Sequence, residues 1–256
     1  MKNIVIQESG MRISFRINDD RTVELVDFSG ITGSQDMSYM GEREQGDWKT
    51  KDTTRQLVSL QLTGHKFIQG YKHNMGSDSS ALLYVNHSIV RTDKKKKECL
   101  ADPFVRSAGQ LLCIEMEDKD QPGLSVKYHM QLFDGIAAVR TWVTLENNGQ
   151  EAVGIDYVTS FLYEGMGKNG SRPYYDRFQL YVPRNSWANE AQWNSFDVTE
   201  LGLSFMPVEG FNLPETSNNR FHYGNMGSWS TCEYLPMGIC EDTECKETYF
   251  FQIDHS

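Results

Sequence analysis

The chain has 256 residues, of which 39% are hydrophobic, 23% charged and 12% aromatic. This composition is typical of a globular protein with a large core and excludes an intrinsically disordered one. Acidic residues outnumber basic ones by 35 to 25, and the resulting formal charge of -10 repels phosphate backbones and anionic membranes. Nucleic acids and membranes are therefore not expected as partners.

Alternating apolar and polar residues near the N-terminus predict a β-hairpin. Residues 11–17 place an apolar side chain at every second position, which gives a strand one apolar face. The Asn-Asp-Asp sequence of residues 18–20 is typical of a turn, and a return strand begins at Val23. A second alternating run, residues 58–62, ends at Gly64 and predicts another short strand.

The most regular alternation covers residues 124–132 and predicts a strand with one buried face. The positions assigned to that face are Leu124, Val126, Tyr128, Met130 and Leu132. Asp134 and Gly135 follow directly and favour a tight hairpin turn, so residues 136–145 are the predicted partner strand.

The rest of the chain continues this pattern of short strands. Further strands are predicted at residues 82–90, 111–116, 155–162, 178–182, 201–205 and 247–253. No segment sustains apolar residues at helical spacing, so few or no helices are expected. Short strands separated by turn signals indicate an all-β fold, a large antiparallel sandwich of two sheets. Two long polar stretches, residues 30–54 and 164–176, are predicted to be functional or mobile loops.

The organisation of the chain predicts one domain. The sequence contains no internal repeat and no linker, so residues 1–256 are expected to fold as a single unit. Residues 247–253 form a predicted strand just before the chain ends at Ser256. Because a strand needs neighbours for its backbone hydrogen bonds, the chain is expected to be a piece of a longer protein, truncated before its last strands.

Several features predict a soluble, cytoplasmic protein. Residues 1–7 are too few and too polar for a signal peptide, and no apolar stretch is long enough to cross a bilayer. The five cysteines are an odd number without the close spacing of a zinc site, so reduced thiols are the simplest interpretation. A disulfide between Cys240 and Cys245 is the alternative. The basic run of residues 94–97 is predicted to be a solvated hairpin tip.

The sequence contains no recognisable catalytic motif. It has no Gly-x-Ser-x-Gly, His-Glu-x-x-His, phosphate-loop or dinucleotide-binding pattern, and none of the six histidines has a partner at helical metal-binding spacing. Acidic clusters at residues 42–44, 118–120 and 241–244 are predicted to be solvated turns. We therefore expect no catalytic residue, no metal site and no cofactor in this chain.

The tryptophans are the main candidates for ligand or interface contacts, because aromatic rings stack on flat apolar groups such as the faces of sugar rings. Trp187, Trp193 and Trp229 lie in polar segments that look poor in strands, where packing or a domain interface is favoured over ligand stacking. Trp48 lies in a long polar loop and is expected to be exposed. Trp142 lies inside a predicted strand and is expected to belong to the core.

Several segments, in order along the chain, resemble motifs of one enzyme family. Residues 58–64 (VSLQLTG) and 70–73 (GYKH) resemble a strand with a TG turn and a G-x-K-H element. Residues 139–147 (VRTWVTLEN) resemble an R-x-x-V-x-L-x-N strand, and residues 186–190 (SWANE) resemble an A-W-A-R-E segment with asparagine in place of arginine. Residues 220–237 resemble a G-x-x-S-S stretch that leads to a proline. Together these segments resemble the N-terminal domain of glycoside hydrolase family 36, best known for α-galactosidases.

The resemblance implies a galactose-mutarotase-like β-supersandwich that precedes a (β/α)8 barrel. In this family the barrel carries both catalytic aspartates and would begin after Ser256, so neither is expected here. Only Lys72 and His73 match a family element, as sugar-side or interface residues. Many members carry acidic and histidine residues just before that element and close a neighbouring active site with them, whereas residues 66–69 here are Lys-Phe-Ile-Gln.

The interpretation favoured by the sequence is a non-catalytic N-terminal domain of a retaining, α-galactosidase-type hydrolase of carbohydrate metabolism. It would support the barrel, form contacts in a homo-oligomer, contribute to the pocket rim and be inactive alone. The candidate substrate or interface residues are Trp48, Lys72, His73, Trp187, Trp193 and Trp229. The expected partners are a galactoside, bound through the full-length enzyme, the downstream barrel and further copies of the chain.

Two alternative functions stay open at this point. One is a free-standing carbohydrate-binding β-sandwich. The other is a mutarotase-like epimerase, which requires a histidine and a glutamate on the concave side of one sheet. The sequence pairs no such residues.

Overall fold

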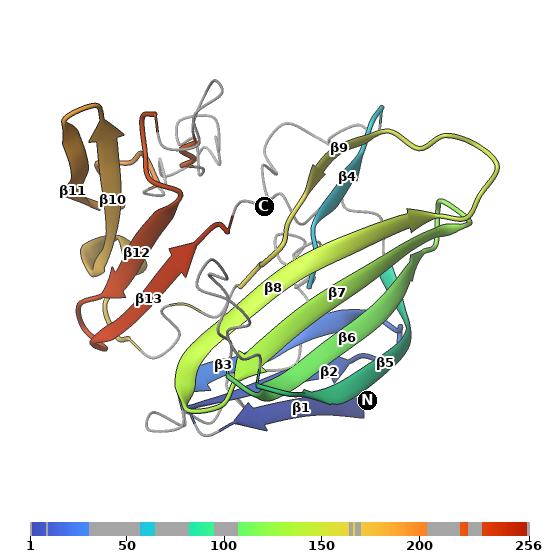
Figure 1. Ribbon diagram of the computed structural model, residues 1–256. Coiled ribbons are helices and arrows are strands. Elements are labelled where there is room, and N and C mark those ends of the chain that lie inside the picture. Colours follow the sequence, from blue (N-terminus) through green and yellow to red (C-terminus); the bar gives the residue numbers. More distant parts are fainter. Residues whose placement is uncertain are drawn as a thin grey trace, which may run out of the picture. The chain divides into compact units, whose positions relative to one another are not determined.

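The computed structural model describes residues 2–8, 10–30, 57–64, 82–94, 107–163, 166, 170–203, 221–224 and 232–254. Within these residues every regular element is a β-strand except a short 3₁₀ helix, η3, at Tyr174–Asp176 (Figure 1). All of the strand pairs are antiparallel. The predicted all-β fold with few or no helices is confirmed.

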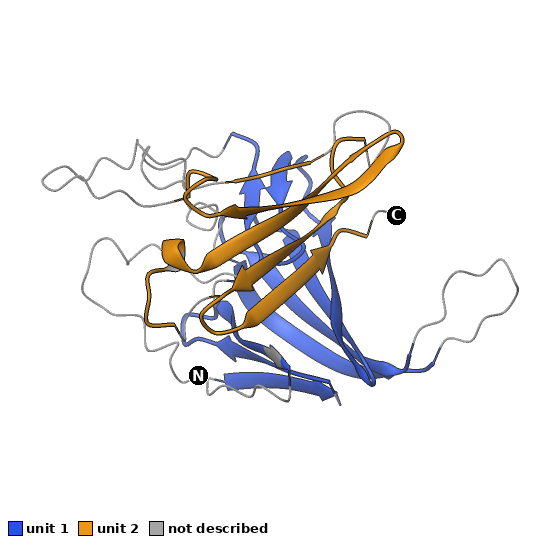
Figure 2. Ribbon diagram, turned by 90° about the vertical axis from the view of Figure 1, so that its left-hand side faces the viewer, with its two compact units in different colours: residues 1–68, 74–165 blue, residues 69–73, 166–256 orange. Residues whose placement is uncertain are grey.

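The chain splits into two compact units (Figure 2). The first unit combines residues 1–68 with 74–165, and the second combines residues 69–73 with 166–256. Each unit contains its own antiparallel sheet or sheets. A single domain over residues 1–256 stays a prediction.

The described residues of the first unit form three sheets. A three-stranded sheet, in the order β1-β2-β3, consists of β1 (Lys2–Glu8), β2 (Met11–Ile17) and β3 (Val23–Gly30). A four-stranded sheet, in the order β5-β6-β7-β8, consists of β5 (Leu82–Thr92), β6 (Gly109–Asp118), β7 (Leu124–Phe133) and β8 (Ile136–Asn147). A two-stranded sheet pairs β4 (Leu60–Leu62) with β9 (Ile155–Val158).

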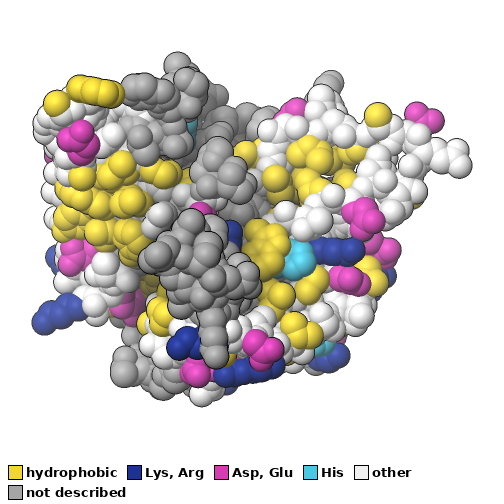
Figure 3. Space-filling view, viewed as in Figure 1, with side chains coloured by type: hydrophobic (Ala, Val, Ile, Leu, Met, Phe, Trp, Pro, Cys, Tyr) yellow, Lys and Arg dark blue, Asp and Glu magenta, His cyan; other side chains and the backbone are white. Residues whose placement is uncertain are grey.

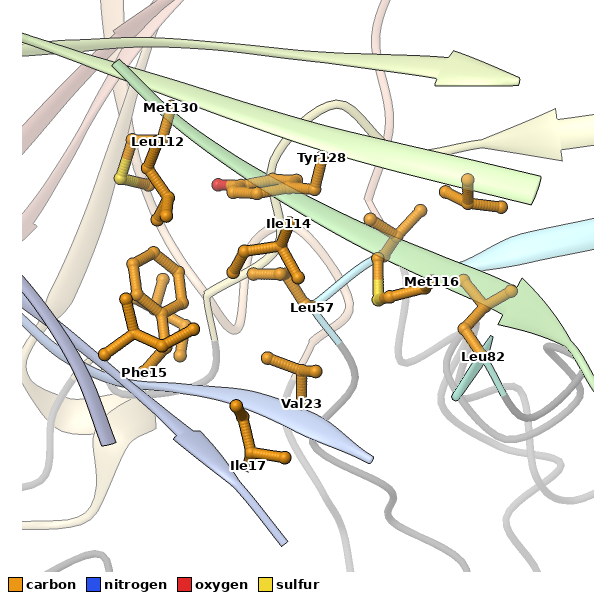
Figure 4. Close-up of a cluster of buried hydrophobic side chains, with 14 of the residues drawn as sticks. Phe15, Ile17, Val23, Leu57, Leu82, Leu112, Ile114, Met116, Tyr128 and Met130 are labelled. Carbon is orange, nitrogen blue, oxygen red and sulfur yellow. The ribbon is translucent and has the colours of Figure 1, made fainter. Parts of the chain in front are cut away.

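The core of the first unit lies between its three-stranded and four-stranded sheets. The apolar positions predicted for residues 124–132 are all buried in it, which confirms the orientation of β7. On the opposing sheet, Phe15 of β2 meets the ring of Tyr128 edge-on, with 6.3 Å between the ring centroids. Figure 4 shows Phe15 facing Ile114 of β6 and Met130 of β7 across this core. Burial of one face of each sheet is therefore the main stabilising contribution in this unit.

Two glycines allow the four-stranded sheet to form. Gly135 closes the β7–β8 hairpin with a φ of 75°, a conformation that residues with a Cβ adopt at a cost. Gly109 lies where β6 begins to pair with β7, and a Cβ there would lie 1.9 Å from the carbonyl oxygen of Leu132. A larger residue at position 109 would therefore push the two strands apart.

The second unit is built on one four-stranded sheet, in the order β11-β10-β12-β13. Its strands are β10 (Phe178–Ser186), β11 (Asn189–Asp197), β12 (Met237–Asp242) and β13 (Glu247–Gln252). On one face, Phe178 and Val182 of β10 are buried. On the same side of the sheet, Tyr223 contacts the rings of Tyr234 and Phe251.

The sequence located most of these strands but not all of them. Three strands were not predicted: β1, β11 and β12. The strand predicted at residues 201–205 is wrong over residues 201–203, which form a turn and its exit, while residues 204–205 lie outside the described part. The predicted strand at 155–162 ends earlier, at Val158. The predicted loop over residues 31–54 and most of the lysine run, residues 95–97, also lie outside the described part.

The described cysteines are free thiols, as the simpler interpretation predicted. They are Cys113, Cys232, Cys240 and Cys245. The alternative disulfide between Cys240 and Cys245 is therefore excluded in this structure. Burial, followed by the nearby Asp242 carboxylate, raises the pKa of the Cys240 thiol to about 11, so this thiol is protonated at neutral pH.

Candidate functional site

Four of the six candidate residues lie outside the described part of the chain: Trp48, Lys72, His73 and Trp229. The other two, Trp187 and Trp193, lie together on the β10–β11 hairpin of the second unit. The structure therefore brings two of the predicted tryptophans onto one element and leaves the predictions for the other four residues untested.

The β10–β11 hairpin presents both of its tryptophans to solvent. Trp187 lies at the tip of the hairpin with 84% of its surface exposed, and Trp193 of β11 is 42% exposed. Ala188, directly after Trp187, has a φ of 58°, which a tight turn requires and which few residues other than glycine adopt. Packing in the core is thus wrong for Trp187, while its place in a domain interface stays a prediction. The description of this segment as poor in strands is wrong, because the segment forms the β10–β11 hairpin.

Two of the acidic clusters predicted to be solvated turns contain a buried carboxylate. Asp118 at the end of β6 accepts hydrogen bonds from the N–H groups of Asp120 and Gln121. Asp242 at the end of β12 accepts bonds from the N–H groups of Glu244 and Cys245 in the same way. Each carboxylate closes the turn that follows its strand, so its role is structural.

Asp242 also forms a buried ion pair that the sequence did not reveal. Its Oδ2 atom lies 3.1 Å from Nη1 of Arg177, and the two side chains are 0% and 3% exposed. The same Arg177 atom lies 3.2 Å from Glu244. No local pattern links position 177 to position 242, so only the pairing of β10 with β12 could show this contact.

Glu244 ties the segment before β10 to the β12–β13 turn. Its carboxylate accepts hydrogen bonds from the hydroxyl and N–H groups of Ser171 and from the N–H group of Arg172. These bonds, led by the Ser171 hydroxyl and helped by the charge of Arg177, lower the pKa of Glu244 to about 2. The carboxylate is therefore ionised at neutral pH and fully engaged by the fold.

The outward face of the four-stranded sheet in the first unit carries a second aromatic group. His129 of β7 stacks on Trp142 of β8, with 4.8 Å between ring centroids and 7° between planes. Nε2 of His129 lies 3.2 Å from the Thr144 hydroxyl, and the guanidinium of Arg140 lies 6.0 Å from the Trp142 ring. Burial, followed by the positive charge of Lys127, lowers the pKa of His129, so its ring is neutral at pH 7.

The core position predicted for Trp142 is wrong, because this side chain shares the outward face with His129. Residues directly opposite in an antiparallel pair lie on the same face, and the inward position of β8 is taken by Val143, opposite Tyr128. The sequence of β8 alternates from residue 139 to residue 146, with apolar Val139, Val143 and Leu145 and polar Arg140, Thr144 and Glu146, so its pattern already assigned Trp142 to the polar face.

The described residues contain neither a metal site nor a helix that could span a membrane. Within the described ranges, no group of three or more His, Cys, Asp or Glu side chains is arranged to hold a metal ion. Nor does that part of the chain contain a helix long and apolar enough to cross a membrane.

Comparison with solved structures places the fold among α-galactosidases. The galactosidase domain of the α-galactosidase–sucrose kinase AgaSK matches with a TM-score of 0.60 and 13% identity over 94% of this chain. The α-galactosidase from Lactobacillus brevis matches with a TM-score of 0.58 and 12% identity, also over 94% of this chain. A variant of the GH36 α-galactosidase AgaA from Geobacillus stearothermophilus, in complex with raffinose, matches with a TM-score of 0.50 and 14% identity over 77% of this chain.

These similarities concern the fold and only one part of the relatives. The chain spans 32%, 31% and 28% of the three solved chains, about a third of their length. A comparison with curated protein sequences finds no match.

The sequence of the chain also matches a protein family. The family described as the glycosyl hydrolase family 36 N-terminal domain matches residues 18–198. This match covers more than half of the chain and includes β3 to β11. The chain therefore belongs to the glycosyl hydrolase family 36 N-terminal domain family.

Proposed function

We propose that this chain is the non-catalytic N-terminal domain of a retaining, α-galactosidase-type glycoside hydrolase that acts on α-galactosides. One observation carries the proposal: the family match over residues 18–198, on a fold similar to α-galactosidases three times as long. The functions proposed for the domain are to support a downstream (β/α)8 barrel and to form contacts in a homo-oligomer. The catalytic aspartates belong to the barrel.

The contacts of the described carboxylates support a non-catalytic role. Retaining hydrolysis needs two carboxyl groups about 5–5.5 Å apart, free to act on a substrate. Asp118 and Asp242 instead close turns, and Glu244 holds the segment before β10. These three acidic groups hold turns and a neighbouring segment in place, and Asp118 and Asp242 are buried away from solvent.

The proposal includes a contribution of Trp48, Lys72 or His73 to the rim of the barrel's substrate pocket, and a cytoplasmic location. Free thiols at Cys113 and Cys240 agree with a reducing compartment. For the rim, Lys72→Ala in the full-length enzyme is expected to raise KM for an α-galactoside with kcat little changed. An unchanged KM in all three single variants would remove the rim from the proposal.

The decisive experiment reads the gene beyond codon 256 and compares two products. The full reading frame is expected to encode a (β/α)8 barrel and to hydrolyse nitrophenyl α-galactoside. The 256-residue chain alone is expected to give no turnover. A stop codon directly after codon 256, or turnover by the short chain, would refute the proposal.

One observation favours the mutarotase-like alternative. His129 and Glu115 project from the same face of the four-stranded sheet, since His129 lies opposite Cys113 and Glu115 lies opposite Lys127 in the β6–β7 register. That reaction needs a histidine and a glutamate on the concave side of a sheet, and the shared face is the part of this requirement that the register supports. The measurement is the interconversion of α- and β-galactose anomers by NMR, with His129→Ala as the control variant. A rate equal to that of buffer would eliminate the alternative.

A further inference from the structure

The outward face of the second unit's sheet, which we call the aromatic face, combines rings with hydrogen-bonding groups. Its central row crosses all four strands through the pairs Ser195–Tyr181, Tyr181–Ile239 and Ile239–Phe250. Trp193, two residues from Ser195, projects from the same face. Figure 3 shows apolar side chains gathered at the surface over this sheet.

The aromatic face is open to solvent. Phe250 is 59% exposed and Trp193 is 42% exposed, although both belong to paired strands. Phe178 and Val182 of β10 are buried and alternate with Tyr181, so they point to the opposite face. Pro183 is also buried but lies on the aromatic face, opposite Trp193, so part of this face is packed while the rings of Trp193 and Phe250 stay exposed.

A polar row lies beside the rings. It crosses the four strands as Asp197, Gln179, Glu241 and Thr248, two residues along from the central row. The Tyr181 hydroxyl donates to Oε2 of Glu241 at 2.6 Å and lies 3.0 Å from Oε1 of Gln179. The bond to Glu241, followed by burial, raises the pKa of Tyr181, which keeps the hydroxyl protonated.

We propose that the aromatic face binds a neutral oligosaccharide, with sugar rings on Trp193, Tyr181 and Phe250 and hydroxyl groups against Glu241, Gln179 and Asp197. The row spacing of about 6.7 Å lets a sugar stacked on one row reach the acceptors of the next. Aromatic rings stack on the C–H face of a pyranose, and carboxylate and amide oxygens accept from its hydroxyl groups.

The chemistry of the face favours a sugar over other occupants. The two acidic groups of the polar row repel anionic ligands. The cores of protein–protein interfaces are depleted of Asp and Glu, whereas here Glu241 is bonded to the central tyrosine. The proposed function depends on the family match and not on this face, so either proposal can fail without the other.

The test is a calorimetric titration of the 256-residue chain with raffinose, stachyose and cellotetraose, the last of which reports on β-linked glucans. At least one sugar is expected to bind with a Kd of about 1 mM or lower. Trp193→Ala and Phe250→Ala are each expected to weaken that binding about tenfold. Trp187→Ala is the matched control, because Trp187 lies at the hairpin tip and outside the rows. The affinity of this variant for the sugar is expected to equal that of the unsubstituted chain.

Three results would overturn this site. The first is the absence of heat with every sugar at concentrations well above 1 mM. The second is binding that survives both Trp193→Ala and Phe250→Ala while circular dichroism shows folded variants. The third is concentration-dependent self-association that these substitutions remove without any effect on sugar, which would identify the face as a protein interface.

Discussion

Replacing Arg177 with methionine removes the cation from a buried ion pair and keeps most of the side chain's volume. Nη1 of Arg177 lies 3.1 Å from Asp242 and 3.2 Å from Glu244, and the arginine side chain is only 3% exposed. The substitution leaves the Asp242 carboxylate buried without its partner charge. Removing one member of a buried pair costs about 3–5 kcal/mol, because the remaining charge cannot be solvated.

A second substitution changes the other member of the ion pair, Asp242. Asp242→Asn keeps an oxygen that accepts from the N–H groups of Glu244 and Cys245, both at 3.1 Å, but removes the negative charge and replaces Oδ2, the atom that faces Arg177, with an N–H donor. Its cost is expected near the lower end, about 3 kcal/mol. In the double variant the fully buried carboxylate is gone, and Glu244 loses Arg177 but keeps its hydrogen bonds to Ser171 and Arg172. The combined cost is therefore expected to fall short of the sum by about 1–3 kcal/mol.

The assay is urea denaturation combined with hydrogen exchange of peptides from β10 and β12, which reports on the second unit by itself. The matched control is Arg172→Met. Arg172 lies 3.8 Å from the same Glu244 carboxylate but is 51% exposed, so its loss is expected to cost about 1 kcal/mol or less. Equal destabilisation by Arg177→Met and Arg172→Met would refute the reasoning, as would strictly additive effects of Arg177→Met and Asp242→Asn.

Three further predictions follow from named contacts. Gly109→Ala is expected to lower the free energy of unfolding by about 3 kcal/mol or more, because its Cβ would lie 1.9 Å from the Leu132 carbonyl oxygen. The Cβ of Gly135→Ala meets no atom, so this variant is expected to lose only about 1–2 kcal/mol through backbone strain. The midpoints of urea denaturation compare the two variants. Phe15→Ala is expected to cost about 3–5 kcal/mol as a core truncation, and a loss below 1 kcal/mol would contradict the packing. The lowered pKa of Glu244 makes its contribution to stability complete above its ordinary value of 4.5 and lost as the pH falls through about 2. Urea denaturation at a series of pH values in that range measures the free energy of unfolding, and its pH dependence is expected to be weaker in Glu244→Gln. The same pH dependence in both proteins would refute this assignment.

Strand β7, with one fully buried face, was predictable from the sequence, and strand β11, exposed along nearly its whole length, was not. Residues 124–132 alternate without a fault because every second side chain of β7 enters the core. Strand β11 is an edge strand whose side chains are nearly all exposed, so burial imposes no period on its sequence. For the same reason Trp193 was placed in a segment described as poor in strands.

Some features of the fold and of the candidate site depend on neighbours along the chain, and others depend on strand pairing. The sequence by itself determined the all-β class and the β7–β8 hairpin at Asp134 and Gly135, because both depend on neighbours along the chain. Only the tertiary structure decided that Arg177 neutralises Asp242 and that Tyr181 and Phe250 share a face. These contacts join residues that lie far apart in sequence, and the register of paired strands, which local patterns do not encode, brings them together.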